Sequence, residues 1–136
     1  MKHLKTCIVI SLDGFIARKD GDLNWMPGNI KKEISAAYEI PSVFIAGVNT
    51  YNMIFRNWGG WPYKSKKTFV VSHYDTNVTR KDNVTFLTDV PLRAINELKS
   101  SSETDIQVIG GGKFITSLIE ASLLDEITLY IVPVML

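Results

Sequence analysis

Cysteine is almost absent from the chain, and neither one sign of charge nor a long apolar run dominates it. Cys7 is the single cysteine among 136 residues, so no disulfide framework can form within one chain. With only two histidines beside it, the usual soft ligands of a zinc cluster are too few, and we predict no metal site. Lys plus Arg number 15 and Asp plus Glu number 14, a balance that argues against a nucleic-acid or membrane-surface partner. The longest apolar run, residues 129–136, is interrupted by Pro133 and is too short to span a bilayer.

The rest of the composition is that of an ordinary globular domain. Apolar residues make up 46% of the chain and charged residues 21%, which excludes a disordered tail or a fibre. The length fits a single domain over residues 1–136. Only four apolar residues follow residues 1–6 before the turn Ser11-Leu12-Asp13-Gly14. No export signal is therefore visible, and we expect a cytoplasmic protein.

Short apolar runs that end in a turn or a glycine recur along the chain, as is typical of strands covered on both faces. The runs are residues 7–10, 43–46, 68–71, 106–109 and 127–132. Helix patterns lie between them at residues 30–40, 50–55 and 113–121, and Asp89-Val90-Pro91 opens another. This alternation predicts an α/β fold with a largely parallel central sheet flanked by helices. Such sheets bind ligands at the carboxyl ends of their strands, where the residues following each run should lie.

Three consecutive glycines, Gly110-Gly111-Gly112, lie with Lys113 between a predicted strand and a predicted helix. Glycine lets the backbone turn sharply and lets a ligand approach the main chain. Amides at the start of a helix, where the helix dipole is positive, would suit a phosphate. The alternative is a tight connection without a ligand, and the residues alone leave both open. The spacing matches neither the G-x-G-x-x-G dinucleotide fingerprint nor a Walker loop.

A second junction between a strand and a helix is Gly47-Val48-Asn49-Thr50. Its simplest interpretation is that Asn49 or Thr50 caps the following helix. The functional interpretation makes its amides and the Thr50 hydroxyl a second phosphate clamp. Two such junctions on one sheet would hold the two ends of a dinucleotide, and this coincidence favours a cofactor site more than either motif alone.

Three polar residues elsewhere have both a structural and a functional interpretation. Asp13 precedes a glycine, and Asp-Gly is a strong turn dipeptide. Glu33 stands beside two lysines on the first predicted helix, a pattern typical of a solvated charged face. His73 follows a buried strand and is more often a polar residue of the strand end than a catalyst.

Read together, these junctions resemble the dihydrofolate-reductase-like family, and most closely its branch related to the reductase domain of bacterial riboflavin biosynthesis. Each motif is short, but their order and spacing agree across nearly the whole chain. The motifs are Ser11-Leu12-Asp13-Gly14-Phe15-Ile16-Ala17, Gly21-Asp22-Leu23-Asn24-Trp25, Gly47-x-x-Thr50-Tyr51, Trp61-Pro62-Tyr63, Val108-Ile109-Gly110-Gly111-Gly112, Leu124-Asp125-Glu126 and Val132-Pro133-Val134.

The resemblance implies a mixed, mostly parallel sheet flanked by helices that binds NADPH in extended form. By resemblance, Val9 and Ile16 flank the nicotinamide with backbone groups, and Ser72 lies near the adenosine 2′-phosphate. Trp25 is then a substrate-binding residue. The phosphates are held from one side by Gly47, Asn49 and Thr50, and from the other by Gly110, Gly111, Gly112, Lys113 and Phe114.

The activity implied by the resemblance is hydride transfer from NADPH to a small heterocyclic substrate. The branch suggests 5-amino-6-(5-phosphoribosylamino)uracil reductase of riboflavin biosynthesis. The alternatives are a dihydrofolate reductase and, from another class, a nucleotide-binding protein without catalysis. Glu33 is the nearest match to the proton-donating carboxylate of dihydrofolate reductases, and burial in an apolar cleft would raise its pKa. Asp13 is the other catalytic candidate, either contacting the substrate or ordering the loop after the first strand.

The chain departs from the family pattern at two positions. Val48 and His73 stand where the family often has Arg, which is the usual bidentate partner of a phosphate. These two departures weaken the case for a strong preference for the 2′-phosphate. The family also commonly has closing strands after Pro133-Val134, so we expect the domain to be incomplete at Leu136. Dimers are common in the family, and we expect a homodimer by the same resemblance.

Overall fold

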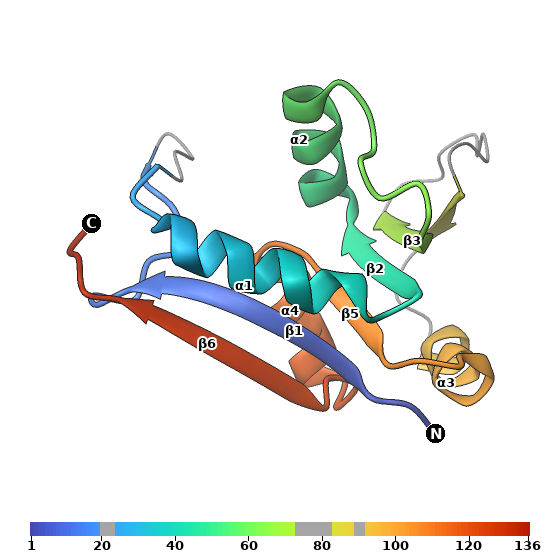
Figure 1. The fold of residues 1–136 in the computed structure, drawn as a ribbon. Coiled ribbons are helices and arrows are strands. Elements are labelled where there is room, and N and C mark those ends of the chain that lie inside the picture. The colour runs from blue at the N-terminus through green and yellow to red at the C-terminus, as the bar shows by residue number, and fades with distance from the viewer. Residues whose placement is uncertain (20–23, 73–82, 89–91) are drawn as a thin grey trace.

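Strands and helices alternate along most of the chain. The computed structural model describes residues 1–19, 24–72, 83–88 and 92–136, and Figure 1 shows their arrangement. In chain order the elements are β1 (Leu4–Ser11), α1 (Gly28–Glu39), β2 (Val43–Gly47), α2 (Val48–Trp58), β3 (Lys67–Ser72), β4 (Val84–Thr88), α3 (Leu92–Ser101), β5 (Ile106–Ile109), α4 (Gly112–Glu120) and β6 (Glu126–Val132). The predicted α/β class is therefore confirmed.

The six strands form one sheet in the order β4-β3-β2-β5-β1-β6. Every pairing between the described strands is parallel, which confirms the prediction of a mostly parallel sheet. Strands β2 and β5 are neighbours, and Ala46 is the register partner of Ile109. Because Gly47 and Gly110 directly follow this pair, the two predicted junctions meet at one edge of the sheet.

Apolar side chains cover both faces of the sheet and form two clusters. One cluster joins the sheet to α3 and α4 through Ile95, Ile115 and Leu118. The other joins it to α1 and α2, with an aromatic centre formed by Tyr38, Phe44, Tyr51, Trp61 and Tyr63. Figure 1 shows α1 in front of the sheet and α4 behind it. All residues of β2 and β5 are buried, as expected for strands covered on both faces.

Strand β6 is not covered on both faces, so that part of the prediction is wrong. Ile127, Leu129 and Ile131 are 40%, 53% and 59% exposed and alternate along one face. The reason is position, because β6 is the last strand of the sheet and pairs only with β1 among the described strands. Strand β4 was not predicted, because threonines interrupt the apolar residues of Val84–Thr88 and leave no apolar run longer than two residues.

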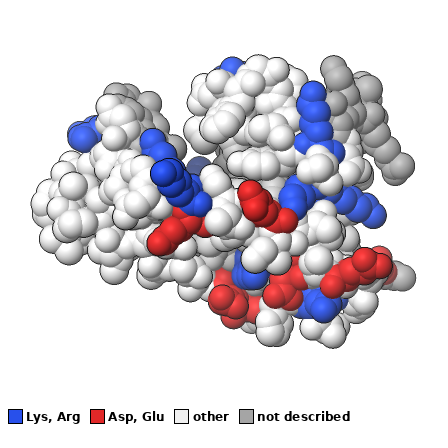
Figure 2. Space-filling model, viewed as in Figure 1, with Lys and Arg blue, Asp and Glu red and all other residues white. Residues whose placement is uncertain are grey.

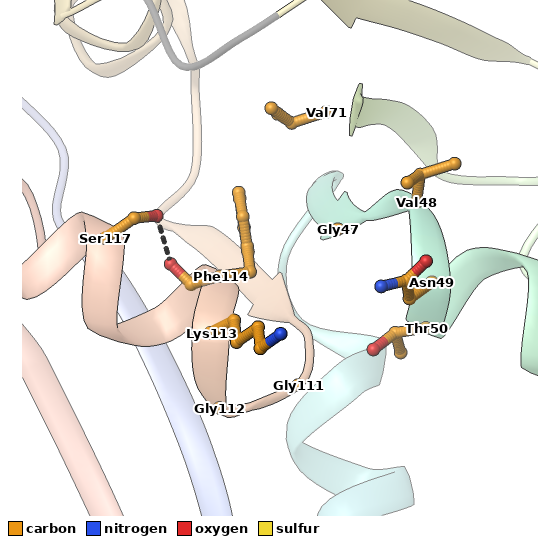
Figure 3. A pocket seen from close by; sticks show the side chains of 10 residues that line it. All are labelled: Gly47, Val48, Asn49, Thr50, Val71, Gly111, Gly112, Lys113, Phe114 and Ser117. Carbon is orange, nitrogen blue, oxygen red and sulfur yellow. Dashed lines mark hydrogen bonds between the residues drawn. The ribbon is translucent and has the colours of Figure 1, made fainter. Parts of the chain in front are cut away.

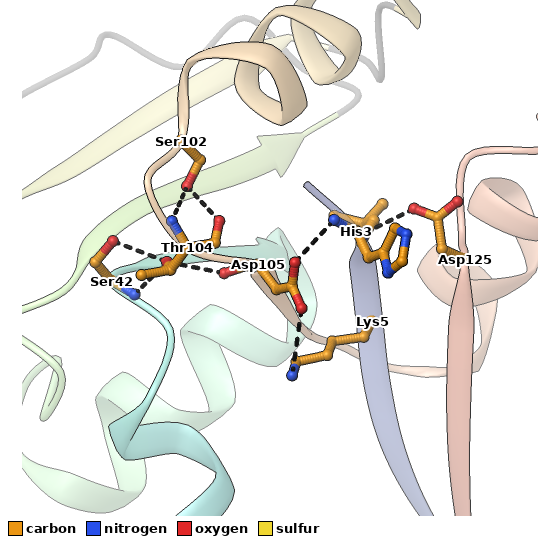
Figure 4. Close-up of polar contacts among 8 residues, drawn as sticks. His3, Lys5, Ser42, Ser102, Thr104, Asp105 and Asp125 are labelled. Carbon is orange, nitrogen blue, oxygen red and sulfur yellow. Dashed lines mark hydrogen bonds and ion pairs between the residues drawn. The ribbon is translucent and has the colours of Figure 1, made fainter. Parts of the chain in front are cut away.

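Polar contacts fix the opposite end of the sheet, where the strands begin (Figure 4). The Asp105 carboxylate accepts a hydrogen bond from the His3 amide at 3.0 Å and lies 3.7 Å from Lys5 Nζ. Asp125 Oδ2 accepts hydrogen bonds from the Leu4 amide at 2.8 Å and from Lys99 Nζ at 2.7 Å. These contacts hold β1 to the starts of β5 and β6. The glycine junctions lie at the opposite edge, where the strands end.

Charged side chains do not gather by sign on the face that Figure 2 shows, where acidic and basic residues are interspersed. This matches the formal net charge of +1. Within the described part of the chain, no helix has the length and apolar character that a bilayer crossing requires. Among the same residues, no three His, Cys, Asp or Glu side chains lie together in a way that could hold a metal ion.

Candidate functional site

A cavity of about 560 Å³ lies at the carboxyl edge of the sheet, between the starts of α2 and α4 (Figure 3). Its walls come from both glycine junctions and from the end of β3. The lining residues are Gly47, Val48, Asn49, Thr50, Val71, Gly111, Gly112, Lys113, Phe114 and Ser117. Two segments more than 60 residues apart in the sequence therefore form one site.

Both helices begin at this cavity without a side chain that caps them. The N-cap residues are Gly47 for α2 and Gly111 for α4, and neither start has a side-chain cap hydrogen bond. The interpretation of Asn49 or Thr50 as the cap of α2 is therefore wrong, because both lie inside its first turn. The first amides of a helix have no partner within the helix, and the dipole there is positive. The site thus presents two helix starts suited to an anion.

Side chains add polar groups to the same space. In Figure 3 the Lys113 ammonium and the Thr50 hydroxyl face each other across the cavity, and the Asn49 side chain lies beside Thr50. Ser117 Oγ donates to the Phe114 carbonyl oxygen at 2.6 Å, so that hydroxyl is already engaged. Lys113 is exposed, so its ammonium keeps its charge without a desolvation penalty and can bind an anionic ligand at the start of α4.

Gly47 and Gly110 are needed for space and not for an unusual backbone angle. The described glycines with positive φ are Gly14, Gly59 and Gly60, none of which belongs to the two junctions. A Cβ on Gly47 would lie 3.1 Å from Phe114 Cβ, and one on Gly110 would lie 3.0 Å from Phe114 Cδ1. The close approach of α4 to the strand ends therefore explains these glycines better than the sharp turn that the sequence suggested.

Seven of the predicted cofactor residues line the cavity and four do not. Those that do are Gly47, Asn49, Thr50, Gly111, Gly112, Lys113 and Phe114. Among the others, Gly110 packs against the Phe114 ring, and Ser72 is buried as the last residue of β3. Val9 is buried in β1, whereas Ile16 is 46% exposed on the loop after it. His73 lies outside the described residues.

Asp13 is held by contacts with the backbone and with a neighbouring side chain. Its carboxylate accepts a hydrogen bond from Ser11 Oγ at 2.5 Å and from the Leu136 amide at 3.1 and 3.2 Å. The hydrogen bond from Ser11 is the main reason that the pKa of Asp13 lies below its usual value. A carboxylate of lowered pKa is a poor proton donor at neutral pH. Of the two roles predicted for Asp13, the geometry favours ordering the loop after β1.

Glu33 and Trp25 lie away from the cavity. Glu33 is exposed on α1 and does not lie in the apolar cleft that its predicted role as proton donor requires. Trp25 is half-buried just before α1, and its indole Nε1 is buried without a hydrogen-bond partner among the described residues. A buried donor of this kind requires an acceptor, which a bound ligand can provide.

Val48, Val71 and Ser117 line the cavity and were not predicted as site residues. Val71 stands one position before Ser72 at the end of β3, and the rule that strand ends carry the site would have included it. Ser117 lies on α4 beyond the glycine turn. No motif marks it, because its position follows from the direction in which α4 leaves the sheet.

A parallel sheet with these two helix starts at its carboxyl edge defines a protein of the dihydrofolate-reductase-like fold. A dihydrofolate reductase from Enterococcus faecalis, solved in complex with NADP(H) and RAB-propyl, superimposes with a TM-score of 0.65 at 18% identity and covers 98% of this chain and 72% of that one. The chain belongs to the RibD C-terminal domain family, whose sequence profile matches residues 2–136.

Other known proteins are similar to the chain in sequence or in fold. A Shewanella sp. PV-4 protein provisionally assigned to riboflavin biosynthesis has a TM-score of 0.81 at 28% identity and covers 98% of this chain and 78% of that one. The RibD protein of Acinetobacter baumannii gives 0.72 at 15% identity, with all of this chain matching 47% of that one. The Bacillus subtilis protein YwjB, which is uncharacterised, is 26% identical over 132 residues, or 95% of this chain and 75% of that one.

Proposed function

We propose that the chain is an NADPH-dependent reductase that transfers hydride to a small heterocyclic substrate. The observation that carries the proposal is the cavity between the starts of α2 and α4, which two uncapped helices and Lys113 make suitable for an anion. The family membership and the dihydrofolate-reductase-like fold support the same class of reaction.

The residues present fit an extended dinucleotide phosphate. The amides at the start of α2 and the Thr50 hydroxyl would hold one phosphate, and the amides at the start of α4 with Lys113 would hold the other. Val9, in β1 next to β5, and Ile16 would flank the nicotinamide with backbone groups. When bound, NADPH supplies the hydride, and the chain supplies orientation and a site from which water is excluded.

The substrate that the family favours is the aminouracil of riboflavin biosynthesis, reduced as in 5-amino-6-(5-phosphoribosylamino)uracil reductase, and dihydrofolate is the alternative. Trp25 would face this substrate, since its buried Nε1 can donate to a heterocycle carbonyl or ring nitrogen. Asp13 would act indirectly, through the loop that it ties to Leu136.

A second candidate function is nucleotide binding without catalysis. It is favoured by the state of the two carboxylates, because Glu33 is exposed and Asp13 is hydrogen-bonded with a lowered pKa. Neither is then placed as the proton donor that a reductase of this kind needs. This candidate shares the cavity and the cofactor with the first and differs only in turnover.

Titration with NADPH and NADH, followed by the fluorescence of Trp25, Trp58 and Trp61, tests binding. We expect micromolar binding that weakens about tenfold in Lys113→Ala, because a charge-assisted phosphate contact is lost, and not in Lys31→Ala on the exposed side of α1. Oxidation of NADPH at 340 nm with the aminouracil substrate would support the first candidate. Turnover only with dihydrofolate would select the alternative substrate, and binding without turnover the second candidate. No binding of either dinucleotide would refute both.

A further inference from the structure

Phe114 lies between the two junctions and touches both. It is the third residue of α4, half-buried, and it packs against the apolar cluster on the α3 and α4 face of the sheet. Its Cβ and Cγ would be 3.1 and 3.3 Å from a Cβ on Gly47, and its Cδ1 would be 3.0 Å from a Cβ on Gly110. The Phe114 side chain therefore fills the space that side chains at both glycines would need.

This position sets how far apart the two helix starts lie. Gly47 is the N-cap of α2, and Gly110 immediately precedes the N-cap of α4. A Cβ on Gly110 would also lie 3.7 Å from the Gly47 backbone nitrogen, so the two chains are themselves close. Packed interiors resist compression and collapse only partly when atoms are removed. A ring clamped between two backbones thus acts as a spacer of fixed width.

We propose that Phe114 is a positioning residue that holds the starts of α2 and α4 at the separation a dinucleotide requires. The proposal rests on the proposed function, because it assigns the ring a role in binding one ligand at both helix starts. A ligand that engages both starts depends on their separation. A fragment such as ADP, which can be held by one start, does not. The Phe114 side chain therefore controls affinity for the whole cofactor without making a polar contact with it.

The two glycines offer an asymmetric test of the spacer. At Gly110 the tight contact is with the ring atom Cδ1, and the next neighbour, Phe114 Cβ, would lie at an ordinary 3.6 Å. At Gly47 the tightest contact, at 3.1 Å, is with Phe114 Cβ itself, and Cγ follows at 3.3 Å. The substitution Phe114→Ala removes Cδ1 and keeps Cβ. It should therefore relieve Gly110→Ala and leave Gly47→Ala unrelieved.

The experiment measures NADPH affinity, ADP affinity and melting temperature in five variants: F114A, G110A, G47A, G110A/F114A and G47A/F114A. We expect G110A and G47A each to weaken NADPH binding about tenfold or more and F114A about fivefold, as single changes that displace packed groups do. G110A/F114A should bind no more weakly than F114A alone. G47A/F114A should stay at least as weak as G47A. ADP affinity in F114A should change less than about twofold.

Two controls keep the outcomes separate. Gly28→Ala, at the first residue of α1, places its Cβ where no atom lies within 4 Å, and it should leave binding and melting unchanged. Phe114→Leu keeps Cγ and should recover part of the affinity that F114A loses. Additive losses in G110A/F114A would overturn the proposal. An equal loss of ADP and NADPH affinity in F114A would overturn it too, since the ring would then contact the ligand directly.

Failure of the proposed function gives a different pattern. If the natural chain binds neither NADPH nor NADH, the reductase proposal fails and the cofactor role of the spacer falls with it. The packing role is then still decided by melting temperature. G110A and G47A should each lower the melting temperature. Adding F114A should cancel the loss caused by G110A, but it should not cancel the loss caused by G47A. Equal behaviour of the two double variants would overturn the spacer itself.

Discussion

Replacing Asp125 with Asn tests how the end of the sheet opposite the cavity is held together. Lys99 is 6% exposed and donates from Nζ to Asp125 Oδ2 at 2.7 Å, and the same oxygen accepts the Leu4 amide at 2.8 Å. Asn at this position can still accept one hydrogen bond. It cannot neutralise the Lys99 ammonium, which would be left as an unpaired charge in a buried place.

The expected loss of stability in Asp125→Asn depends on how far the ion pair is exposed to water. Removing one partner of a fully buried ion pair costs about 3–5 kcal/mol. The Asp125 side chain is 35% exposed, so water screens part of the pair, and we expect a loss of about 2 kcal/mol in the free energy of unfolding. The matched control is Asp105→Asn, whose pair with Lys5 spans 3.7 Å between side chains that are 36% and 30% exposed. That loss should stay below about 1 kcal/mol.

The dependence on pH gives a second test of the same pair. Partial burial acts to raise the pKa of Asp125, but the hydrogen bonds from Lys99 and Leu4 outweigh it, and the pKa in the folded chain is lowered. A lowered pKa contributes stability that is present above the unfolded value, about 3.9, and is lost as the pH falls through the folded value. The difference between the natural chain and Asp125→Asn should therefore be full at pH 7 and shrink below about pH 4.

Urea unfolding at pH 7, 5 and 3, followed by circular dichroism, measures all three proteins under the same conditions. The reasoning would be refuted if Asp125→Asn at pH 7 cost no more than Asp105→Asn. It would also be refuted if the cost of Asp125→Asn were as large at pH 3 as at pH 7.

Three further variants test other parts of the structure. Trp61→Phe removes the hydrogen bond from Nε1 to Thr68 Oγ1 at 3.2 Å and leaves a cavity in a fully buried place, so urea unfolding should show a loss of about 1–3 kcal/mol. Asp13→Asn weakens the contact with Leu136, and we expect NADPH affinity to hold while kcat/KM falls about tenfold, equally from pH 6 to 8, because the group is already ionised there. An equal loss of NADPH affinity would contradict the loop-ordering role. Glu33→Gln on the exposed face of α1 should leave kcat within about twofold, and a hundredfold loss would restore Glu33 as the proton donor.

The fold was largely predictable because buried parallel strands have a simple signature. The continuous apolar runs that became β2 and β5 are recognisable without their partners, whereas the adjacency of these two strands is known only from the structure. Strand β4 was not predicted because Val84–Thr88 is short and has only two consecutive apolar residues. The exposure of β6 could not be predicted either, because an apolar run does not show whether another element packs against the strand.

The site was predictable in its location and less so in its contacts. The sequence places Thr50 and Lys113 after two strands, and the structure brings them to one cavity. It could not show that Phe114 is the reason for Gly47 and Gly110, because that requires the direction of α4. The exposure of Glu33 agrees with the solvated charged face that the neighbouring lysines indicated, and not with the catalytic role that the resemblance implied.

Amide chemical shifts during a titration with NADPH test the central claim most directly. If one dinucleotide spans the starts of α2 and α4, the amides of residues 48–50 and 112–114 should shift together with one dissociation constant. Shifts at only one helix start, or shifts that saturate at different concentrations of NADPH, would contradict the account.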